Sequence, residues 1–288
     1  MIVVTGATGR LGAQIVDRLL ERVPADTVGV SVRDIGKAAD LASRGVRVRA
    51  GDFTEPGTLD EAFEDADQVL VVSAAIRGPG AAQANRAAIE AAVRAGASRV
   101  LYTSHQAASP DSLFAAQPQH AATQSLMAEQ GIAWTALRHG FYASSLEIYL
   151  PAALETGELR LPEDGPFSWT SHADLAEVDA IALTQPGVLE GISPPLTAPE
   201  ALDFTDVAHV LSDLTGRTIT RVVVDDEEWK ASAVARGLPA PVADFTLGMF
   251  RAARDGEFAA TDPTLERLLG RPAISARTTI EEIVASQQ

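Results

Sequence analysis

The chain contains no cysteine and only two lysines, Lys37 and Lys230. Without cysteine, disulfide bonds, cysteine-ligated metals and thiol catalysis are excluded, and a reducing cytoplasm is the simplest setting. Because every other residue in the Lys-plus-Arg total is arginine, a mechanism that needs a catalytic lysine has only these two candidates.

Aromatic residues and positive charge are also scarce. Aromatics make up 5% of the 288 residues against 46% apolar residues, so we expect a core of alanine, valine and leucine. The formal net charge of −16 argues against nucleic acid or an anionic membrane as a general partner. No apolar run approaches ~18 residues and no export signal precedes the first strand, so we expect a cytoplasmic protein without membrane insertion.

A glycine turn near the start of the chain is its most informative feature. A short apolar strand leads into Gly-x-x-Gly-x-x-Gly, formed by Gly6, Gly9 and Gly12, and an amphipathic helix follows. Gly6 allows a sharp turn, Gly9 a close approach to a pyrophosphate, and Gly12 close packing of the helix, whose free N–H groups attract phosphate. The pattern predicts a dinucleotide site, in preference to an ordinary glycine-rich turn. The other residues assigned to this turn are Thr8, Arg10 and Leu11.

Strand-like and helix-like segments alternate over the first half of the chain. We expect strands at 28–32, 46–50, 68–73, 100–104 and 133–137, and helices at 80–95 and 121–130. This order predicts an α/β fold with a doubly wound parallel (Rossmann) sheet. Prolines punctuate shorter elements later on. We therefore expect an NAD(P)-binding domain over residues 1–150 and a smaller C-terminal α/β substrate lobe over 151–288. The boundary is approximate, because the chain can cross back to the sheet after residue 150.

The end of the second predicted strand favours NADP over NAD. Arg33 stands at the strand tip, where NAD-binding proteins usually carry an acid, and an arginine there suits a 2′-phosphate. Lys37 and Arg10 add two cations that can surround the same phosphate. Asp34 keeps NAD open as an alternative, and Arg33 and Lys37 as solvated surface charges are another.

Asp52 and Phe53 follow the third predicted strand. There the carboxylate can accept from the adenine amino group and the ring can flank the base, although a local Asx turn is an equally good interpretation of Asp52. Ser73, at the end of the fourth strand, is assigned to the same cofactor site.

The chain resembles the NmrA-like branch of the atypical short-chain dehydrogenases, most of all its bacterial NADPH:quinone oxidoreductase type. The resemblance covers nearly the whole chain and implies an NADP-binding sheet, a small C-terminal lobe and a substrate cleft between them. The residues that carry it are the glycine turn, Val32-Arg33-Asp34 with Lys37, Gly51-Asp52-Phe53, Tyr102-Thr103-Ser104, His120 with Thr123, and Leu137-Arg138-His139-Gly140-Phe141-Tyr142.

No tyrosine is followed four residues later by lysine: those positions hold Gln106, Leu146 and Ala153. The usual route of short-chain dehydrogenases between alcohol and ketone is therefore not expected. Quinone reduction requires less of a protein, because placing the nicotinamide against a strong hydride acceptor is most of the catalysis.

Catalytic and substrate-binding candidates follow from position. Tyr102 comes near the end of the fifth predicted strand, and His120 matches a family position facing the cleft, where it can donate a proton near neutral pH. Gln124 stands where those oxidoreductases carry an acid, which weakens an acid–base role. For each candidate, simple packing is the alternative. The expected substrate-binding residues are His105, Gln106, His139, Phe141 and Tyr142.

The sequence thus predicts an NADPH-dependent oxidoreductase that transfers a hydride to a quinone or similar small electrophile. The alternatives are an NADP(H)-sensing regulator without turnover and a tailoring reductase or epimerase of an aromatic metabolite. The five histidines show no spacing that indicates a metal site. The expected partner is a small molecule, and a homodimer is left open.

Overall fold

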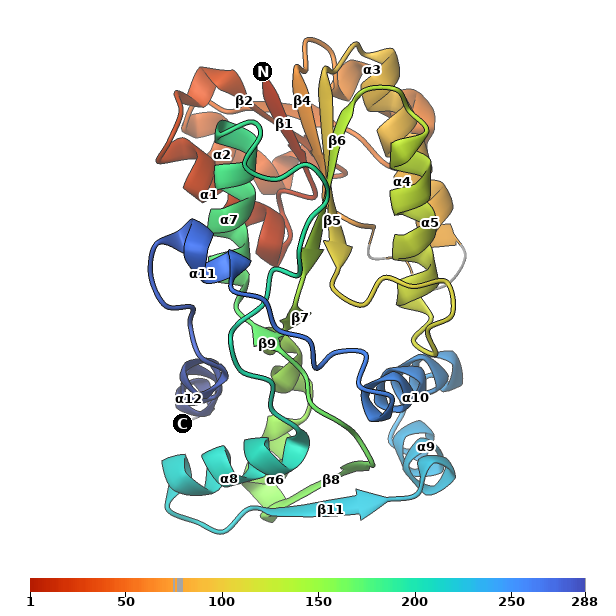
Figure 1. The fold of residues 1–288 in the computed structure, drawn as a ribbon, viewed down its shortest axis with the longest axis vertical. Coiled ribbons are helices and arrows are strands. Elements are labelled where there is room, and N and C mark those ends of the chain that lie inside the picture. Colours follow the sequence, from red (N-terminus) through yellow and green to blue (C-terminus); the bar gives the residue numbers. More distant parts are fainter. Residues whose placement is uncertain (75, 77–79, 288) are drawn as a thin grey trace.

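A computed structural model describes residues 1–74, 76 and 80–287 and contains a seven-stranded sheet in the order β10-β6-β5-β4-β1-β2-β3 (Figure 1). All neighbouring strands of this sheet run parallel, which confirms the predicted doubly wound Rossmann sheet. The carboxyl ends of the strands meet at one edge, where such sheets bind ligands. The strands are β1 (Ile2–Thr5), β2 (Val28–Val32), β3 (Arg47–Ala50), β4 (Gln68–Val71), β5 (Arg99–His105), β6 (Ala133–His139) and β10 (Gly191–Ile192).

Helices cover both faces of the sheet (Figure 1). One face carries α1 (Arg10–Leu20), α2 (Ala39–Ser43) and α7 (His172–Thr184), and the other carries α3 (Leu59–Ala62), α4 (Gly80–Arg94) and α5 (Ala116–Ala128). The apolar stripe of α1 is fully buried against β1, β2 and α7, as its helical spacing requires. The two cores beside the sheet consist mainly of valine, leucine and alanine, as the composition predicts.

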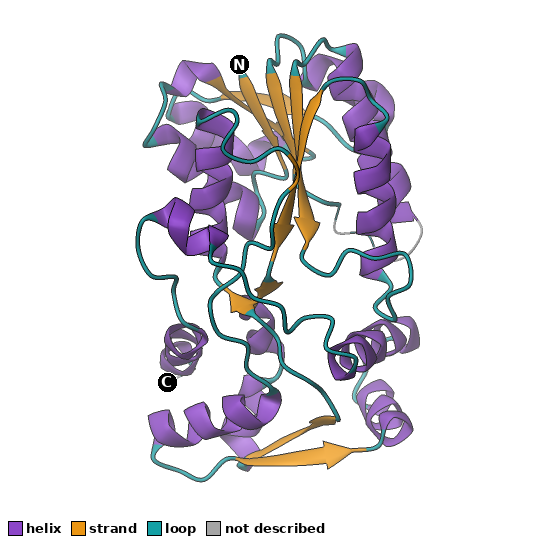
Figure 2. Cartoon of the chain, viewed as in Figure 1, coloured by secondary structure: helices purple, strands orange, loops and turns teal. Residues whose placement is uncertain are grey.

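A second lobe lies beyond the carboxyl edge of the sheet (Figure 2). It is built on a parallel pair of strands, β8 (Glu158–Pro162) and β11 (Thr220–Val224). Its core combines alanine, leucine and isoleucine with a cluster of aromatic side chains, which the composition alone did not locate. Its helices are α6 (Leu150–Thr156), α8 (Phe204–Thr215), α9 (Asp226–Ala235), α10 (Ala240–Arg254) and α12 (Ala276–Ser286).

The chain passes between the two lobes more than once. β7 (Phe141–Tyr142) pairs with β9 (Trp169–Thr170) at the junction, after which α7 packs against α1 and β10 joins the sheet beside β6 (Figure 1). α11 (Thr264–Leu269) returns to pack on α7. Residues on both sides of position 150 therefore build the sheet layer.

The start of α5 differs from its prediction. The helix begins at Ala116 and not at Ala121. Pro118 is compatible with this earlier start because it lies in the first turn, where the missing N–H of proline costs no helical hydrogen bond. α8 was not predicted, although Asp203 and Asp206 form a capping box at its start. Among the described residues, no helix is both long and apolar enough to span a membrane.

Candidate active site

The glycine turn joins β1 to α1 at the carboxyl edge of the sheet. Gly6 has a left-handed φ of 62°, and the Gly9 N–H donates to the Gly6 carbonyl at 2.9 Å. A Cβ on Gly12 would lie 2.3 Å from the Gly6 oxygen, so close packing requires glycine there. Gly9 precedes α1 without a side-chain cap, which leaves the start of the helix suited to an anion.

Two neighbours of the glycines differ in what they offer a cofactor. Thr8 is exposed beside the turn. Leu11 buries its side chain in the core beneath α1, so only its backbone N–H is placed to meet a phosphate.

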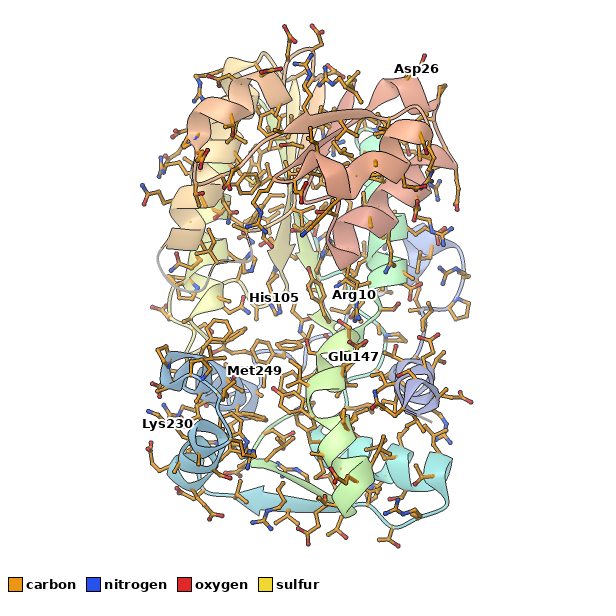
Figure 3. All side chains as sticks on the ribbon, turned by 180° about the vertical axis from the view of Figure 1, so that it is seen from behind. Arg10, Asp26, His105, Glu147, Lys230 and Met249 are labelled. Carbon is orange, nitrogen blue, oxygen red and sulfur yellow. The ribbon has the colours of Figure 1, made fainter. Side chains whose placement is uncertain are left out.

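Arg10, one of the three predicted phosphate cations, is paired with a carboxylate. Its guanidinium binds Glu147 with two hydrogen bonds of 2.8 and 3.0 Å, and both side chains are about half exposed. Glu147 belongs to a 3₁₀ helix, Ala143–Ile148, that leads into the second lobe, and Figure 3 shows the pair between the lobes. The predicted group of three cations is therefore not assembled in this structure, because a carboxylate from the second lobe holds the third.

The tip of β2 presents Arg33 and Lys37 on the surface. Asp34, the residue that kept NAD open, accepts a hydrogen bond from the Gly36 N–H at 3.0 Å and caps the short 3₁₀ helix Ile35–Ala38. Its carboxylate is thus partly occupied by the backbone, whereas Arg33 lies free to meet a phosphate at the strand tip.

Asp52 forms the local Asx turn that was its alternative interpretation. Its carboxylate accepts from the Thr54 N–H at 2.8 Å and from the Thr54 hydroxyl at 2.7 Å. These bonds, chiefly the backbone one, lower the pKa of Asp52, and the nearby charge of Arg33 contributes. Phe53 is half-buried against the core under α3. A contact of either residue with adenine stays a prediction.

Tyr102 and His120 meet at the wall of a small cavity. The Tyr102 hydroxyl lies 2.8 Å from Nδ1 of His120, and Asn85 of α4 donates to the same hydroxyl at 3.1 Å. The cavity measures about 60 Å³ and also has Ser73 and Phe245 in its lining. The structure therefore brings both predicted catalytic residues together beside one predicted cofactor residue.

Burial decides the protonation of this pair. It lowers the pKa of His120 to about 4, with the nearby His139 contributing, and it raises the pKa of Tyr102 far above its usual value. Near neutral pH, His120 is therefore neutral and Tyr102 keeps its proton. This does not fit the prediction that His120 donates a proton near neutral pH, and instead makes Nδ1 an acceptor for the Tyr102 hydroxyl.

The residues that follow β5 are tied to the second lobe. His105 accepts from the Ala107 N–H at 3.1 Å, and its ring meets Phe141 and Phe258 edge-on; Figure 3 places it at the junction of the lobes. Burial lowers the pKa of His105 well below its usual value, so its ring is neutral. Gln106 is buried, donating to the Phe258 carbonyl at 2.9 Å and accepting from Ser168 at 2.8 Å. These contacts make Gln106 a link between the lobes and not the predicted substrate contact.

The predicted substrate residues after β6 separate into two environments. Phe141 is 7% exposed and packs edge-on against Phe167 and Trp169, so it belongs to the aromatic core of the second lobe. His139 is fully buried, whereas Tyr142 is half-buried.

Sequence reasoning missed three residues near these groups. Asn85, which holds Tyr102, was visible as a polar residue on the buried face of an alanine-rich helix. Asp179, which contacts His139, was visible as a carboxylate between apolar residues of α7. Glu147, the partner of Arg10, gives no such signal because it lies on a polar surface.

Comparison with known proteins adds to this geometry. A family model described as NAD(P)H-binding matches residues 6–186. The chain is 35% identical to the NAD(P)H azoreductase of Xenophilus azovorans, over 95% of this chain and 94% of that protein. It is 28% identical to an NmrA-like family domain-containing oxidoreductase of Aspergillus flavus, over 99% of this chain and 95% of that protein.

The fold also matches a crystal structure of the NADPH-dependent quinone oxidoreductase QOR2 from Escherichia coli in complex with NADPH. The TM-score is 0.93 at 30% identity, with 99% of this chain and 100% of that chain covered. The likeness therefore includes both lobes.

Proposed function

The chain belongs to the NAD(P)H-binding family, and on this premise we propose that it is an NADPH-dependent oxidoreductase that reduces quinones or similar small electrophiles. The azoreductase and the quinone oxidoreductase among its relatives support this function. The resemblance to NmrA-like oxidoreductases that the sequence indicates is confirmed.

The observation that carries the proposal is that the glycine turn and the cavity adjoin. A Cβ on Gly6 would lie 3.4 Å from the side chain of Val72, and the Val72 N–H donates to the Thr5 hydroxyl at the end of β1. The next residue, Ser73, lines the cavity beside Tyr102. A dinucleotide with its phosphates at the turn can therefore extend its nicotinamide along β4 toward this cavity.

The residues present fit NADPH. The uncapped start of α1 would hold the pyrophosphate, and the tight packing at Gly12 leaves the turn in the conformation that this contact needs. Arg33 and Lys37 would hold the 2′-phosphate, since both are exposed cations at the tip of β2. When bound, NADPH supplies the hydride.

The chain's own contribution is orientation at the cavity wall. Tyr102 keeps its proton and is fixed by Asn85 and by neutral His120, so we assign this pair a role in orienting the ring that enters the cavity. A reduced quinone oxygen takes its proton from water or a modest donor, so the site needs no stronger acid. The missing Tyr-x-x-x-Lys pair is consistent with this chemistry.

Oxidation of NADPH in the presence of a panel of simple quinones and azo dyes tests the function. We expect turnover with at least one quinone, and loss of turnover in Gly9→Val, whose side chain would occupy the place of the pyrophosphate. Tight NADPH binding without oxidation by any acceptor would overturn the enzyme in favour of an NADP(H)-sensing protein.

The neutral state of His120 predicts how the protein responds to acid. Its pKa of about 4 lies below the usual 6.5, so folding favours the neutral ring. The stability gained from this is complete above pH 6.5 and is lost as the pH falls toward 4. We expect His120→Gln to reduce the fall in Tm between these values, and to lower kcat only about two- to fivefold, well below the ~100-fold typical of losing a general acid.

Thermal unfolding across this pH range and steady-state kinetics near neutral pH check both expectations. His209→Gln is the matched control, because His209 is exposed on α8, away from the cavity. An unchanged acid sensitivity in His120→Gln would contradict the prediction.

A further inference from the structure

A buried histidine–carboxylate pair near the candidate site has no role in the function proposed above. Nε2 of His139, at the end of β6, is 2.9 Å from Oδ1 of Asp179 on α7, and both side chains are fully buried. Within the described part of the chain, Oδ2 of Asp179 has no hydrogen-bond partner. A buried carboxylate with so few partners is costly, and replacing such a pair by apolar residues is often neutral or stabilising. Stability alone therefore gives no reason for this pair.

The pair connects to Tyr142. Nδ1 of His139 lies 3.4 Å from the Tyr142 hydroxyl, and Gly140 between them packs so closely that a Cβ there would lie 2.2 Å from Oγ1 of Thr170. The backbone thus holds the two side chains in a fixed relation. Burial raises the pKa of Tyr142, with Asp179 and then Tyr102 contributing, so the hydroxyl keeps its proton.

Tyr142 follows β6 at the carboxyl edge of the sheet, and β6 pairs with β5, which carries Tyr102. Tyr102 of the cavity wall is near enough to influence it electrostatically. The Tyr142 ring also packs against the His172 ring at a centroid distance of 4.3 Å. Burial lowers the pKa of His172, and the charges of Arg10 and Glu147 also act on it. Figure 1 shows β7, which carries Tyr142, at the junction of the two lobes. Parallel sheets of this kind bind their ligands at the carboxyl edge, where this junction lies.

The hydrogen bonds from Asp179 through His139 determine whether the Tyr142 hydroxyl donates or accepts toward a ligand. A carboxylate only accepts, so Nε2 of His139 donates to Asp179. That bond selects the tautomer whose Nδ1 carries a lone pair, which can accept from the Tyr142 hydroxyl 3.4 Å away. The lone pairs of the Tyr142 oxygen then remain as acceptors. Quinone carbonyls also only accept, so they are no partner for this oxygen, whereas the carboxamide of nicotinamide carries N–H donors.

We propose that Asp179 and His139 are positioning residues that orient the Tyr142 hydroxyl as an acceptor for the carboxamide N–H of the cofactor's nicotinamide. The proposal rests on the function proposed above and extends it to the residues that set the orientation of the nicotinamide ring. Asp179 fixes the proton on Nε2, as a carboxylate does for a histidine in other hydrogen-bonded chains.

Calorimetric titration with NADPH and with its reduced acetylpyridine analogue tests the proposal, because the analogue carries a methyl group in place of the carboxamide nitrogen. We expect Tyr142→Phe to weaken NADPH binding about three- to tenfold, the value of one hydrogen bond, and to change analogue binding less than about twofold. In Asp179→Asn the amide donates to Nε2, which moves the proton to Nδ1 and reverses the bond to Tyr142. We expect the same selective loss, and no further loss in the double variant.

Asp164→Asn is the matched control, because it alters the comparably buried pair Arg221–Asp164 in the second lobe, and thermal unfolding verifies that each variant is folded. Equal losses with both cofactors, additive losses in the double variant, or unchanged NADPH binding in Tyr142→Phe would overturn the proposal. If the wild-type chain binds NADPH but does not oxidise it with any acceptor, only the proposed function is overturned. The titrations with NADPH and the acetylpyridine analogue would still test the contact between Tyr142 and the carboxamide.

Discussion

Gly12→Ala is expected to lower kcat/KM for NADPH by about 100-fold or more, the loss that follows from displacing a positioned group by ~1 Å. A Cβ at this position would lie 2.3 Å from the oxygen and 2.8 Å from the carbonyl carbon of Gly6. Both are backbone atoms of the turn itself, so relief requires the turn or the start of α1 to shift. The N–H groups that meet the pyrophosphate would shift with it.

Two other glycines serve as controls for this variant. A Cβ added at Gly57 would have no atom within 4 Å, so Gly57→Ala should bind NADPH as the wild type does. Gly9→Ala meets only the Gly6 oxygen at 3.3 Å, so it should fold normally, and its loss of NADPH affinity should come from the Cβ meeting the pyrophosphate and not from a shift of the turn. Calorimetric titration and thermal unfolding measure these effects. If Gly12→Ala bound NADPH as tightly as Gly57→Ala, the turn would not be the pyrophosphate site.

Arg33→Ala is expected to weaken NADPH binding about 10- to 100-fold, since hydrogen bonds to charged groups contribute ~1.5–3 kcal/mol and each ~1.4 kcal/mol is a factor of ten. NADH binding should change by less than about twofold, because it has no 2′-phosphate. Arg33 is exposed at the tip of β2, and the acid beside it, Asp34, already accepts from the Gly36 N–H. The strand tip therefore offers a cation more readily than a carboxylate.

Separate titrations with NADPH and NADH decide the point. Arg18→Ala is a suitable control, since Arg18 is a partly exposed arginine on α1 that pairs with Glu21. Equal losses for both cofactors in Arg33→Ala would show that this residue does not recognise the 2′-phosphate.

Local sequence patterns were enough to predict the sheet and the cofactor turn. The strand over residues 28–32 was predicted at the bounds that the structure shows. A short apolar run between turns is typical of a parallel strand that is covered on both faces of the sheet. The turn was predictable because its glycines act on neighbours within a few residues, as the 2.9 Å bond from Gly9 to Gly6 illustrates. The start of α9 is a local signal of the same kind, because its first turn carries acidic residues that match the helix dipole.

Contacts between distant residues were not predictable in this way. Arg10 was assigned to a phosphate, but its partner Glu147 lies 137 positions away. Gln106 was assigned to the substrate, but it binds Phe258 from the other lobe. Both assignments were based on where the residues stand along the sheet. The contacts that these residues make with the second lobe could not be predicted, because the sequence did not show which elements of that lobe face the sheet.

The sequence by itself determined the fold class, and it predicted the dinucleotide turn and the preference for NADP, because each depends on residues close together in the chain. The tertiary structure alone decided the protonation of His120 and the pairing of His139 with Asp179, since both depend on burial by elements far apart in sequence. Removing water raises the free energy of a lone charge, so His120 is neutral and Asp179 requires a partner. Such effects arise only after the chain has folded around these groups.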